Sequence, residues 1–191
     1  MFQRMLVAVS VAAALGAYGK TAAADDAGPC VRQPNLLVAD LGLHVVNAAY
    51  QRTLSCAFSA QIGAGLYVPW VVNRDVFGLG GGDRSPPDDV AGFVVRGRGF
   101  FHLANDPQAG PWLSPFAQAG PVRATRDDRS VRGRALAAGL SAGWAFAFGT
   151  HWRLALGAGV QYHVAQFGDS AARPGFARLG PTIDINLGYA L

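Results

Sequence analysis

The sequence predicts an all-β fold, an eight-stranded up-and-down antiparallel transmembrane β-barrel. Three observations lead to this prediction. Eight stretches have strand character, large apolar residues alternate with small or polar ones along them, and short turns alternate with long polar connections. Short turns at one end of a sheet and long loops at the other are typical of bacterial outer-membrane barrels. A chain of 191 residues is long enough for one such domain.

The first 24 residues have the character of a secretory signal peptide. Arg4 precedes an apolar stretch that runs from Met5 to Ala17, and an alanine triplet then precedes two aspartates. This pattern predicts export through the general secretory pathway, with cleavage after Ala24. The apolar stretch is shorter than the roughly 20 residues of a membrane-spanning helix, which disfavours an N-terminal anchor.

The charge of the exported chain does not indicate a nucleic-acid partner. Removal of Arg4 and Lys20 reduces the 16 basic residues to 14, against 12 acidic ones, which leaves a net charge of +2. This imbalance is too small to predict binding to nucleic acid. All the acidic residues are Asp and all the remaining basic ones are Arg, whereas large soluble surfaces usually carry Lys and Glu as well.

Eight strands are predicted within residues 35–191, which we assign to the barrel, and residues 25–34 form a periplasmic segment before it. In chain order the strands are Leu36–Leu43, Val45–Arg52, Ala57–Trp70, Gly92–Leu103, Trp112–Arg123, Ala135–Phe148, Trp152–Phe167 and Arg178–Leu191. The join between the first two is not sharply marked. Short turns at 55–56, 104–110 and 149–150 alternate with polar connections at 71–91, 125–134 and 168–177.

Alternation is clearest along four stretches, which are 58–70, 135–148, 152–164 and 179–191. If the bulky apolar face pointed into a soluble lipocalin-like barrel, the exterior would consist of glycine and alanine, which have weak strand propensity. If that face meets lipid, the small residues fit the crowded interior of an eight-stranded barrel. The second arrangement explains both faces. A membrane-spanning helix between Arg134 and Arg153 is disfavoured, because it would scatter the bulky residues around its circumference.

The inward positions collect eight polar residues, which are Asp40, Gln61, Arg96, Arg98, Gln118, Gln161, His163 and Asp184. Buried charges persist only when they are paired, so we expect Arg96 and Arg98 to bridge to Asp184 and Asp40. This network would fill the lumen, since eight strands leave space only for side chains. A proton or ion path is the alternative.

Aromatic residues gather near the predicted strand ends, where outer-membrane barrels carry aromatic girdles. We predict that six of them lie at the membrane interface: Trp70, Trp112, Phe146, Phe148, Trp152 and Tyr189.

Cys30 precedes the first strand and Cys56 lies in the first short turn, so both should face the periplasm. Disulfides persist in this oxidising compartment, and a bond between Cys30 and Cys56 would tie the N-terminal segment to the barrel. Whether the two thiols are close enough to bond is not readable from the sequence.

Residues 35–191 resemble the small eight-stranded outer-membrane barrels of the OmpX and OmpA transmembrane-domain type. They are more similar still to an uncharacterised branch of bacterial barrel proteins, which has an N-terminal strand containing NLL and LGLH and a terminal stretch like DINLGYAL. In that last strand Ile183, Ile185, Leu187 and Tyr189 alternate as in the signal that the barrel-assembly machinery reads. Leu191 replaces the usual final aromatic residue, which weakens the signal.

Two motifs bear on catalysis. GLSAG at 139–143 matches the nucleophile elbow, but Ser141 falls within a predicted strand, without the strand-turn-helix context that the chemistry needs. The resembling lipid A deacylases use a His-x-Ser pair, and none of the four histidines here has a serine two residues later. We therefore expect no catalytic, cofactor-binding or metal-binding residues.

These inferences predict a non-enzymatic, monomeric outer-membrane barrel with a side-chain-filled lumen. We expect it to contact outer-membrane lipid and lipopolysaccharide, and to act in envelope structure or surface interaction through the loops at 71–91 and 124–134. A barrel-borne lipid-modifying enzyme and a soluble periplasmic carrier of a small apolar ligand are the alternatives.

Overall fold

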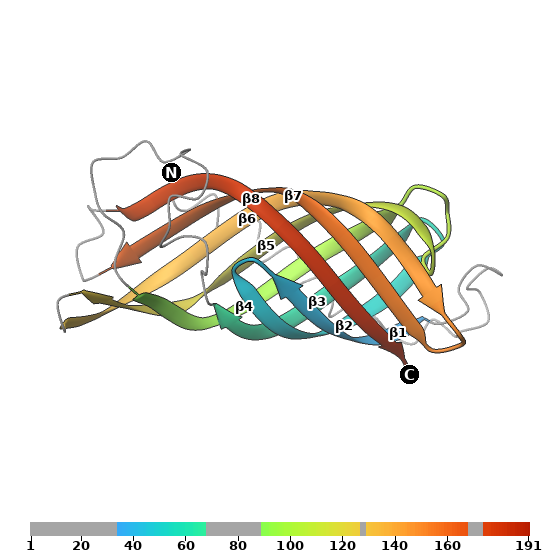
Figure 1. Cartoon of the computed structure of the whole chain (residues 1–191), viewed down its shortest axis with the longest axis horizontal. Coiled ribbons are helices and arrows are strands. Elements are labelled where there is room, and N and C mark those ends of the chain that lie inside the picture. The colour runs from blue at the N-terminus through green and yellow to red at the C-terminus, as the bar shows by residue number, and fades with distance from the viewer. Residues whose placement is uncertain (1–33, 68–88, 127–128, 168–173) are drawn as a thin grey trace.

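The computed structural model describes residues 34–67, 89–126, 129–167 and 174–191. Its strands are β1 Asn35–Gly42, β2 Val45–Ser55, β3 Phe58–Tyr67, β4 Asp89–His102, β5 Gly110–Arg126, β6 Arg129–Phe148, β7 Trp152–Phe167 and β8 Pro174–Ala190. Each strand pairs antiparallel with the next, and β8 pairs with β1, so the sheet closes into an up-and-down barrel (Figure 1). The predicted eight-stranded fold is confirmed. No helix in the described ranges is long and apolar enough to cross a membrane.

Several sequence predictions lie outside the described residues. These are the signal peptide and most of the segment before β1, Cys30, Trp70, and nearly all of the predicted loop 71–91. Within the described ranges, β7 has the bounds that the sequence predicts. The bounds of β1 to β5 differ from the prediction by no more than three residues, whereas β6 begins six residues and β8 four residues before the predicted start.

Side-chain alternation explains which face of each strand points inward. Residues of β2 alternate between buried and exposed along nearly the whole strand, as the two-residue period of a strand requires. Large apolar side chains are exposed on the outside of every strand except β5. Examples from five strands are Leu37, Ile62, Leu140, Val160 and Leu187.

The β5–β6 hairpin is longer than predicted. Its register continues to the pair Arg126 and Arg129, so most of the predicted loop 125–134 is strand, and that prediction is wrong. Charged residues were the loop signal in this stretch. Arg132 and Arg134 point into solvent from β6, so their charges do not prevent strand pairing. By contrast, the β1–β2 hairpin ends well short of β5–β6 (Figure 1).

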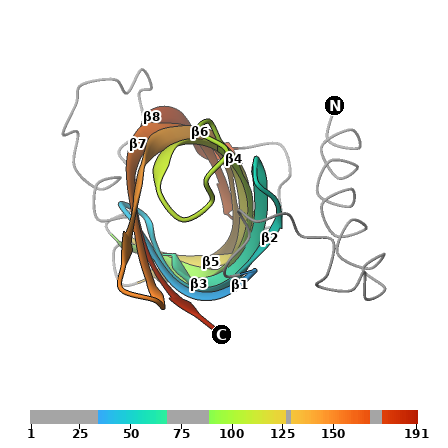
Figure 2. The same ribbon diagram turned by 90° about the vertical axis from the view of Figure 1, so that its right-hand side faces the viewer.

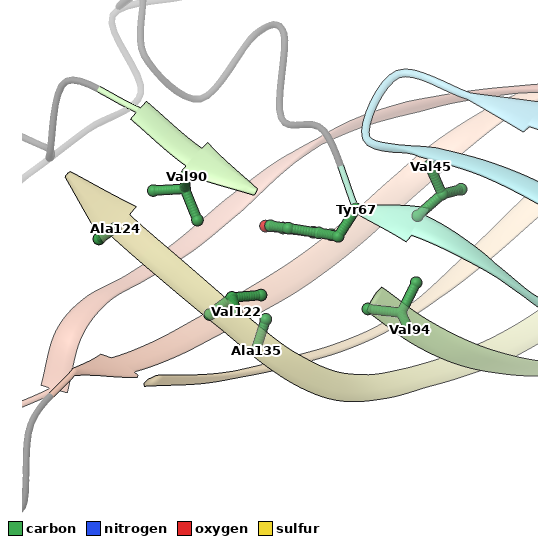
Figure 3. Packing of buried hydrophobic residues seen from close by; sticks show 7 residues of the cluster. All are labelled: Val45, Tyr67, Val90, Val94, Val122, Ala124 and Ala135. Atoms are coloured by element: carbon green, nitrogen blue, oxygen red, sulfur yellow. The ribbon is translucent and has the colours of Figure 1, made fainter. Parts of the chain in front are cut away.

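Three apolar clusters lie in the described interior, and two of them lie at different heights along β4. One cluster, near the ends of β3 and β5, consists of Val45, Tyr67, Val90, Val94, Val122, Ala124 and Ala135 (Figure 3). The second consists of Phe100, Trp112, Ala145 and Ala155, and the third consists of Leu36, Val38, Ala49 and Ala190. Along β4, the polar residues Arg96 and Arg98 lie between Val94 of the first cluster and Phe100 of the second. The interior is therefore layered, with charge between two apolar layers.

Trp112 belongs to the second cluster, and its predicted place at the membrane interface is wrong. The side chain is 1% exposed and packs on Phe100, with ring centroids 5.3 Å apart. Small residues on the facing strands leave room for the indole. A Cβ atom built on Gly157 would lie 2.3 Å from Cη2 of Trp112. The position of Trp112 near a strand end was misleading. Alternation along β5 points Trp112 inward together with Ser114 and Phe116.

We call the end of the barrel that carries the C-terminus the turn end. It holds the short connections β2–β3, β4–β5 and β6–β7. At this end the connection between β4 and β5 folds across part of the opening, and Pro107 within it is fully buried (Figure 2). Four predicted interface aromatics, Phe146, Phe148, Trp152 and Tyr189, point outward near this end. Gly149 turns β6 into β7 with a φ of 58°, a conformation that favours glycine.

Candidate functional site

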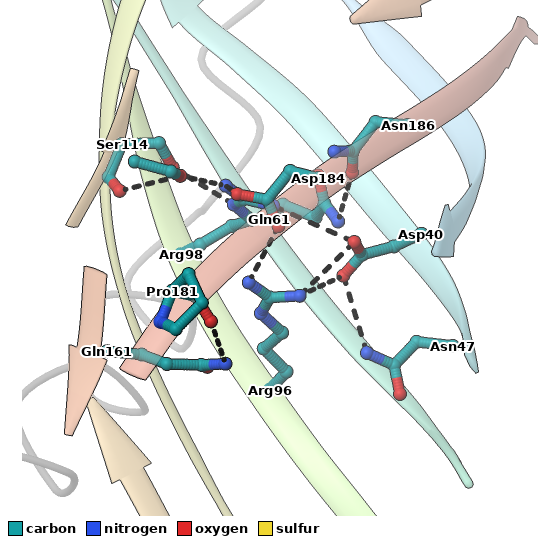
Figure 4. Close-up of polar contacts among 11 residues, drawn as sticks. Asp40, Asn47, Gln61, Arg96, Arg98, Ser114, Gln161, Pro181, Asp184 and Asn186 are labelled. Atoms are coloured by element: carbon teal, nitrogen blue, oxygen red, sulfur yellow. Dashed lines mark hydrogen bonds and ion pairs between the residues drawn. The ribbon is translucent and has the colours of Figure 1, made fainter. Parts of the chain in front are cut away.

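Four charged side chains meet in the middle of the barrel, and we call them the charged cluster. Arg96 Nη1 lies 3.2 Å from Asp40 Oδ2, and Arg96 Nη2 lies 3.0 Å from Asp184 Oδ1. Arg98 Nη2 lies 3.1 Å from Asp184 Oδ2, and Arg98 Nη1 lies 3.7 Å from Asp40 Oδ1 (Figure 4). All four side chains are almost completely buried. Two positive and two negative charges therefore balance one another in the interior of the barrel.

Strand geometry brings these residues together. Arg96 and Arg98 are two positions apart on β4, so both point inward. Asp40 on β1 and Asp184 on β8 lie close together on neighbouring strands. Asp184 is the register partner of Gly42, which lies two residues after Asp40. Arginine is long enough to reach across a narrow barrel, and its planar fork suits carboxylate oxygens.

Neutral partners hold the charged cluster in place. Ser114 Oγ accepts a hydrogen bond from Arg98 Nε at 2.9 Å, and Ser141 Oγ accepts one from Arg98 Nη2 at 2.9 Å. Asn47 Nδ2 donates to Asp40 Oδ2 at 3.3 Å. The ring of Phe116 stacks under Arg96, with its centroid 4.1 Å from Cζ. Ser141 lies in the middle of β6 and serves as a structural partner of Arg98 in this arrangement.

The four other predicted lumenal residues are also buried but do not join the ion pairs. Gln61 Nε2 donates to Asn186 Oδ1 at 3.4 Å, close to the charged cluster. Gln161 Nε2 donates to the backbone oxygen of Pro181 at 3.3 Å. His163 meets the ring of His44 edge-on, with centroids 4.6 Å apart. Gln118 pairs in register with Arg96.

Sequence reasoning did not assign several further buried polar residues to the interior network, among them His44, Asn47, Gln51, His102, Ser114 and Arg153. Near the turn end, His102 Nε2 and Ser59 Oγ form a hydrogen bond of 2.8 Å, and Arg153 Nη1 donates to Gln51 Oε1 at 3.2 Å. The inward parity of β2 and β5 could have identified Asn47, Gln51 and Ser114. No such signal marks His44, which lies in the connection between β1 and β2.

The described residues contain no group of three or more His, Cys, Asp or Glu side chains that could hold a metal ion. Cys56 is disulfide-bonded, and its predicted partner, Cys30, lies outside the described ranges. The arrangement thus consists of paired charges and hydrogen bonds. Its chemistry is that of a packed polar interior.

Comparison with known proteins places the chain in a family. The family described as "Protein of unknown function (DUF3575)" matches residues 33–171, a span that includes strands β1 to β7. The chain belongs to the DUF3575 family. No curated protein matches its sequence.

The DUF3575 barrel is also similar to a solved structure, the N-terminal β-barrel domain of Pseudomonas aeruginosa OprF. The match has a TM-score of 0.51 and 13% sequence identity, and it covers 83% of this chain and 98% of that chain. At this level of identity the likeness concerns the fold. The match therefore supports the barrel fold that the sequence resemblance predicts.

Proposed function

We propose that this DUF3575 protein is an integral outer-membrane barrel without enzymatic activity, which acts in envelope structure or surface interaction. Its lumen is filled by side chains, and its contacts outside the cell are made at the end of the barrel opposite the turn end. Export through the general secretory pathway and insertion by the barrel-assembly machinery, through β8, belong to the same proposal. So do a monomeric state and contact with outer-membrane lipid and lipopolysaccharide.

One observation carries the proposal: large apolar side chains cover the outer face of the barrel, and paired charges are buried at its centre. Leu41, Ile185 and Leu156 are neighbours in register across β1, β8 and β7, and each is about two-fifths exposed. In water this row would leave a broad apolar surface uncovered. In hydrocarbon the same row is solvated by lipid, and the closed sheet pairs its backbone groups internally.

The interior favours a structural role over the two alternatives. A nucleophilic serine needs a neighbouring base and access to substrate, whereas Ser141 is 1% exposed and hydrogen-bonded to Arg98. A carrier of an apolar ligand needs a hollow apolar interior, whereas ion pairs cross the centre of this barrel.

The test uses the purified mature chain. We expect it to need detergent for solubility and to migrate differently on a gel with and without boiling, as folded membrane barrels do. We also expect it to fractionate with the outer membrane. A monodisperse protein that stays soluble without detergent would overturn the proposal. Lipid analysis of cells with and without the protein tests the enzymatic alternative, and we expect unchanged lipid A.

A further inference from the structure

Arg153 is a buried guanidinium without an acidic partner in the described part of the chain. It is the second residue of β7, close to the turn end, and is 2% exposed. Nη1 donates to Gln51 Oε1, but Nε and Nη2 have no hydrogen-bond acceptor among the described residues. The ion pairs between described residues all belong to Arg96 and Arg98.

This state is unfavourable for an arginine. The guanidinium does not lose its proton in proteins, so it cannot become neutral to escape burial. A buried charge without a partner is strongly destabilising. The ring of Phe100 lies 5.5 Å from Cζ of Arg153 and offers a cation–π contact. That contact leaves the N–H groups unsatisfied.

The side chain that pairs with Arg153 also carries an unsatisfied donor. Gln51 is fully buried, its oxygen faces Arg153, and its Nε2 has no acceptor among the described residues. The amide cannot be turned over, because its NH₂ group would then face the guanidinium donors. The ring of Trp112 packs on Phe100, and in the described part of the chain its indole Nε1 has no acceptor either. Arg153 Nε, Arg153 Nη2 and Gln51 Nε2 are thus three donor atoms on two paired side chains that have no acceptor among the described residues.

The acidic residue that interacts with Arg153 already accepts hydrogen bonds from other groups. Asp106, in the connection between β4 and β5, interacts electrostatically with Arg153 but forms no ion pair with it. Its Oδ1 accepts hydrogen bonds from the backbone N of Gln108 at 2.8 Å and of Ala109 at 3.3 Å. Asp106 is exposed. Because the charged cluster balances itself, Arg153 leaves one uncompensated positive charge in the described interior.

We propose that Arg153 and Gln51 form a binding site for a small monovalent anion, of the size and charge of chloride, that enters from the turn end. The guanidinium supplies the charge, and Arg153 Nε, Arg153 Nη2 and Gln51 Nε2 supply the hydrogen bonds. Phe100, which lies beside Arg153, belongs to a packed cluster with Trp112, Ala145 and Ala155, so we expect large anions to be excluded.

The experiment measures thermal unfolding of the full mature chain in a zwitterionic detergent. Sodium chloride replaces sodium gluconate, a bulky anion, at constant ionic strength. We expect the unfolding midpoint of the wild type to rise saturably, by about 3–6 °C at tenfold excess over the dissociation constant. Chlorine NMR line broadening measures the same binding directly.

Arg153→Met keeps the length of the side chain and removes its charge. We expect this variant to lose both the chloride-dependent rise and the line broadening, and to be more stable than the wild type in gluconate. Gln51→Leu keeps the charge and should weaken binding several-fold. Arg123→Met, on the exposed face of β5, is the matched control and should respond as the wild type does.

Two results would overturn the proposal. One is a wild type whose midpoint and chlorine line width are the same in chloride and gluconate. The other is a chloride response that Arg153→Met and Arg123→Met share. If Arg153→Met does not fold, unchanged line broadening in Gln51→Leu would also contradict it.

Discussion

Asp184 makes more contacts with the two arginines of the charged cluster than Asp40 does. Its Oδ1 accepts hydrogen bonds from Arg96 Nη2 at 3.0 Å and from Arg98 Nη1 at 3.3 Å, and its Oδ2 accepts one from Arg98 Nη2 at 3.1 Å. Removing one member of a buried ion pair leaves the other charge uncompensated, which costs more than the pair itself contributes. Asp184 is therefore the residue whose neutralisation should disturb the interior most.

We predict that Asp184→Asn lowers the free energy of unfolding by about 3–5 kcal/mol. Asn keeps the shape of the side chain but leaves Arg98 with little compensating charge. Urea unfolding of the barrel in lipid vesicles, followed by tryptophan fluorescence, measures the change. Asp106→Asn is the control, because Asp106 is exposed and an Asn side chain can still accept its turn hydrogen bonds. Equal effects of the two substitutions would contradict the role of Asp184.

A second prediction concerns the space that Gly157 leaves for Trp112. Gly157→Ala places a Cβ against the indole and should destabilise the barrel by about 1–3 kcal/mol, the usual effect of overpacking. Trp112→Phe shortens the ring, so the double variant should lose less than the sum of the two single losses. Gly97→Ala is the control, since a Cβ there would have no atom within 4 Å. Additive losses in the same urea titration would show that the two sites do not interact.

At the scale of the strand, alternation predicted most of the fold. Period-2 patterns on β3, β6, β7 and β8 indicated which face is bulky, and inward parity identified the four members of the charged cluster. The predictions were wrong where they were based on residue composition, or on distance from a strand end, and not on alternation. Charged residues were assigned to a loop at 125–134, although arginines that point into solvent are compatible with β6. The pairing of Arg153 with Gln51 depends on contacts across the barrel, which no local pattern encodes.

A charged side chain introduced on β8 tests which face of this strand points to lipid. We predict that Ile185→Lys destabilises the barrel in lipid vesicles by about 2–4 kcal/mol, the cost of a lysine on the lipid face near the bilayer midplane. Leu103→Lys is the control, because Leu103 is 65% exposed but lies in the connection after β4, outside the strands. Urea titrations of the vesicle-bound variants measure both effects. If Ile185→Lys is tolerated as well as Leu103→Lys, β8 does not present Ile185 to lipid.

For the whole molecule, closure of the sheet is the condition on which the other properties depend. An open edge would leave a row of N–H and C=O groups that hydrocarbon cannot solvate. Here β1 and β8 form the seam, paired from Leu36 with Ala190 to Gly42 with Asp184. The seam also brings Asp40 and Asp184 to one side of the lumen, facing the arginines of β4. Barrel closure and charge pairing thus support each other.

The last prediction concerns the register of the seam between β1 and β8. Ala39 and Leu187 are register partners and both point outward, so Ala39→Cys with Leu187→Cys should form a disulfide when the folded barrel is oxidised. Cys56 is already disulfide-bonded and should not compete. The cross-linked chain remains a closed loop after boiling without reductant and should migrate apart from the reduced chain on a gel. Ala39→Cys with Ile183→Cys is the control, since Ile183 also points outward on β8 but lies four residues from the partner of Ala39. Cross-linking in the control to the same extent would mean that β1 and β8 slide past one another, and a seam that slides could not hold Asp40 and Asp184 at the height of Arg96 and Arg98.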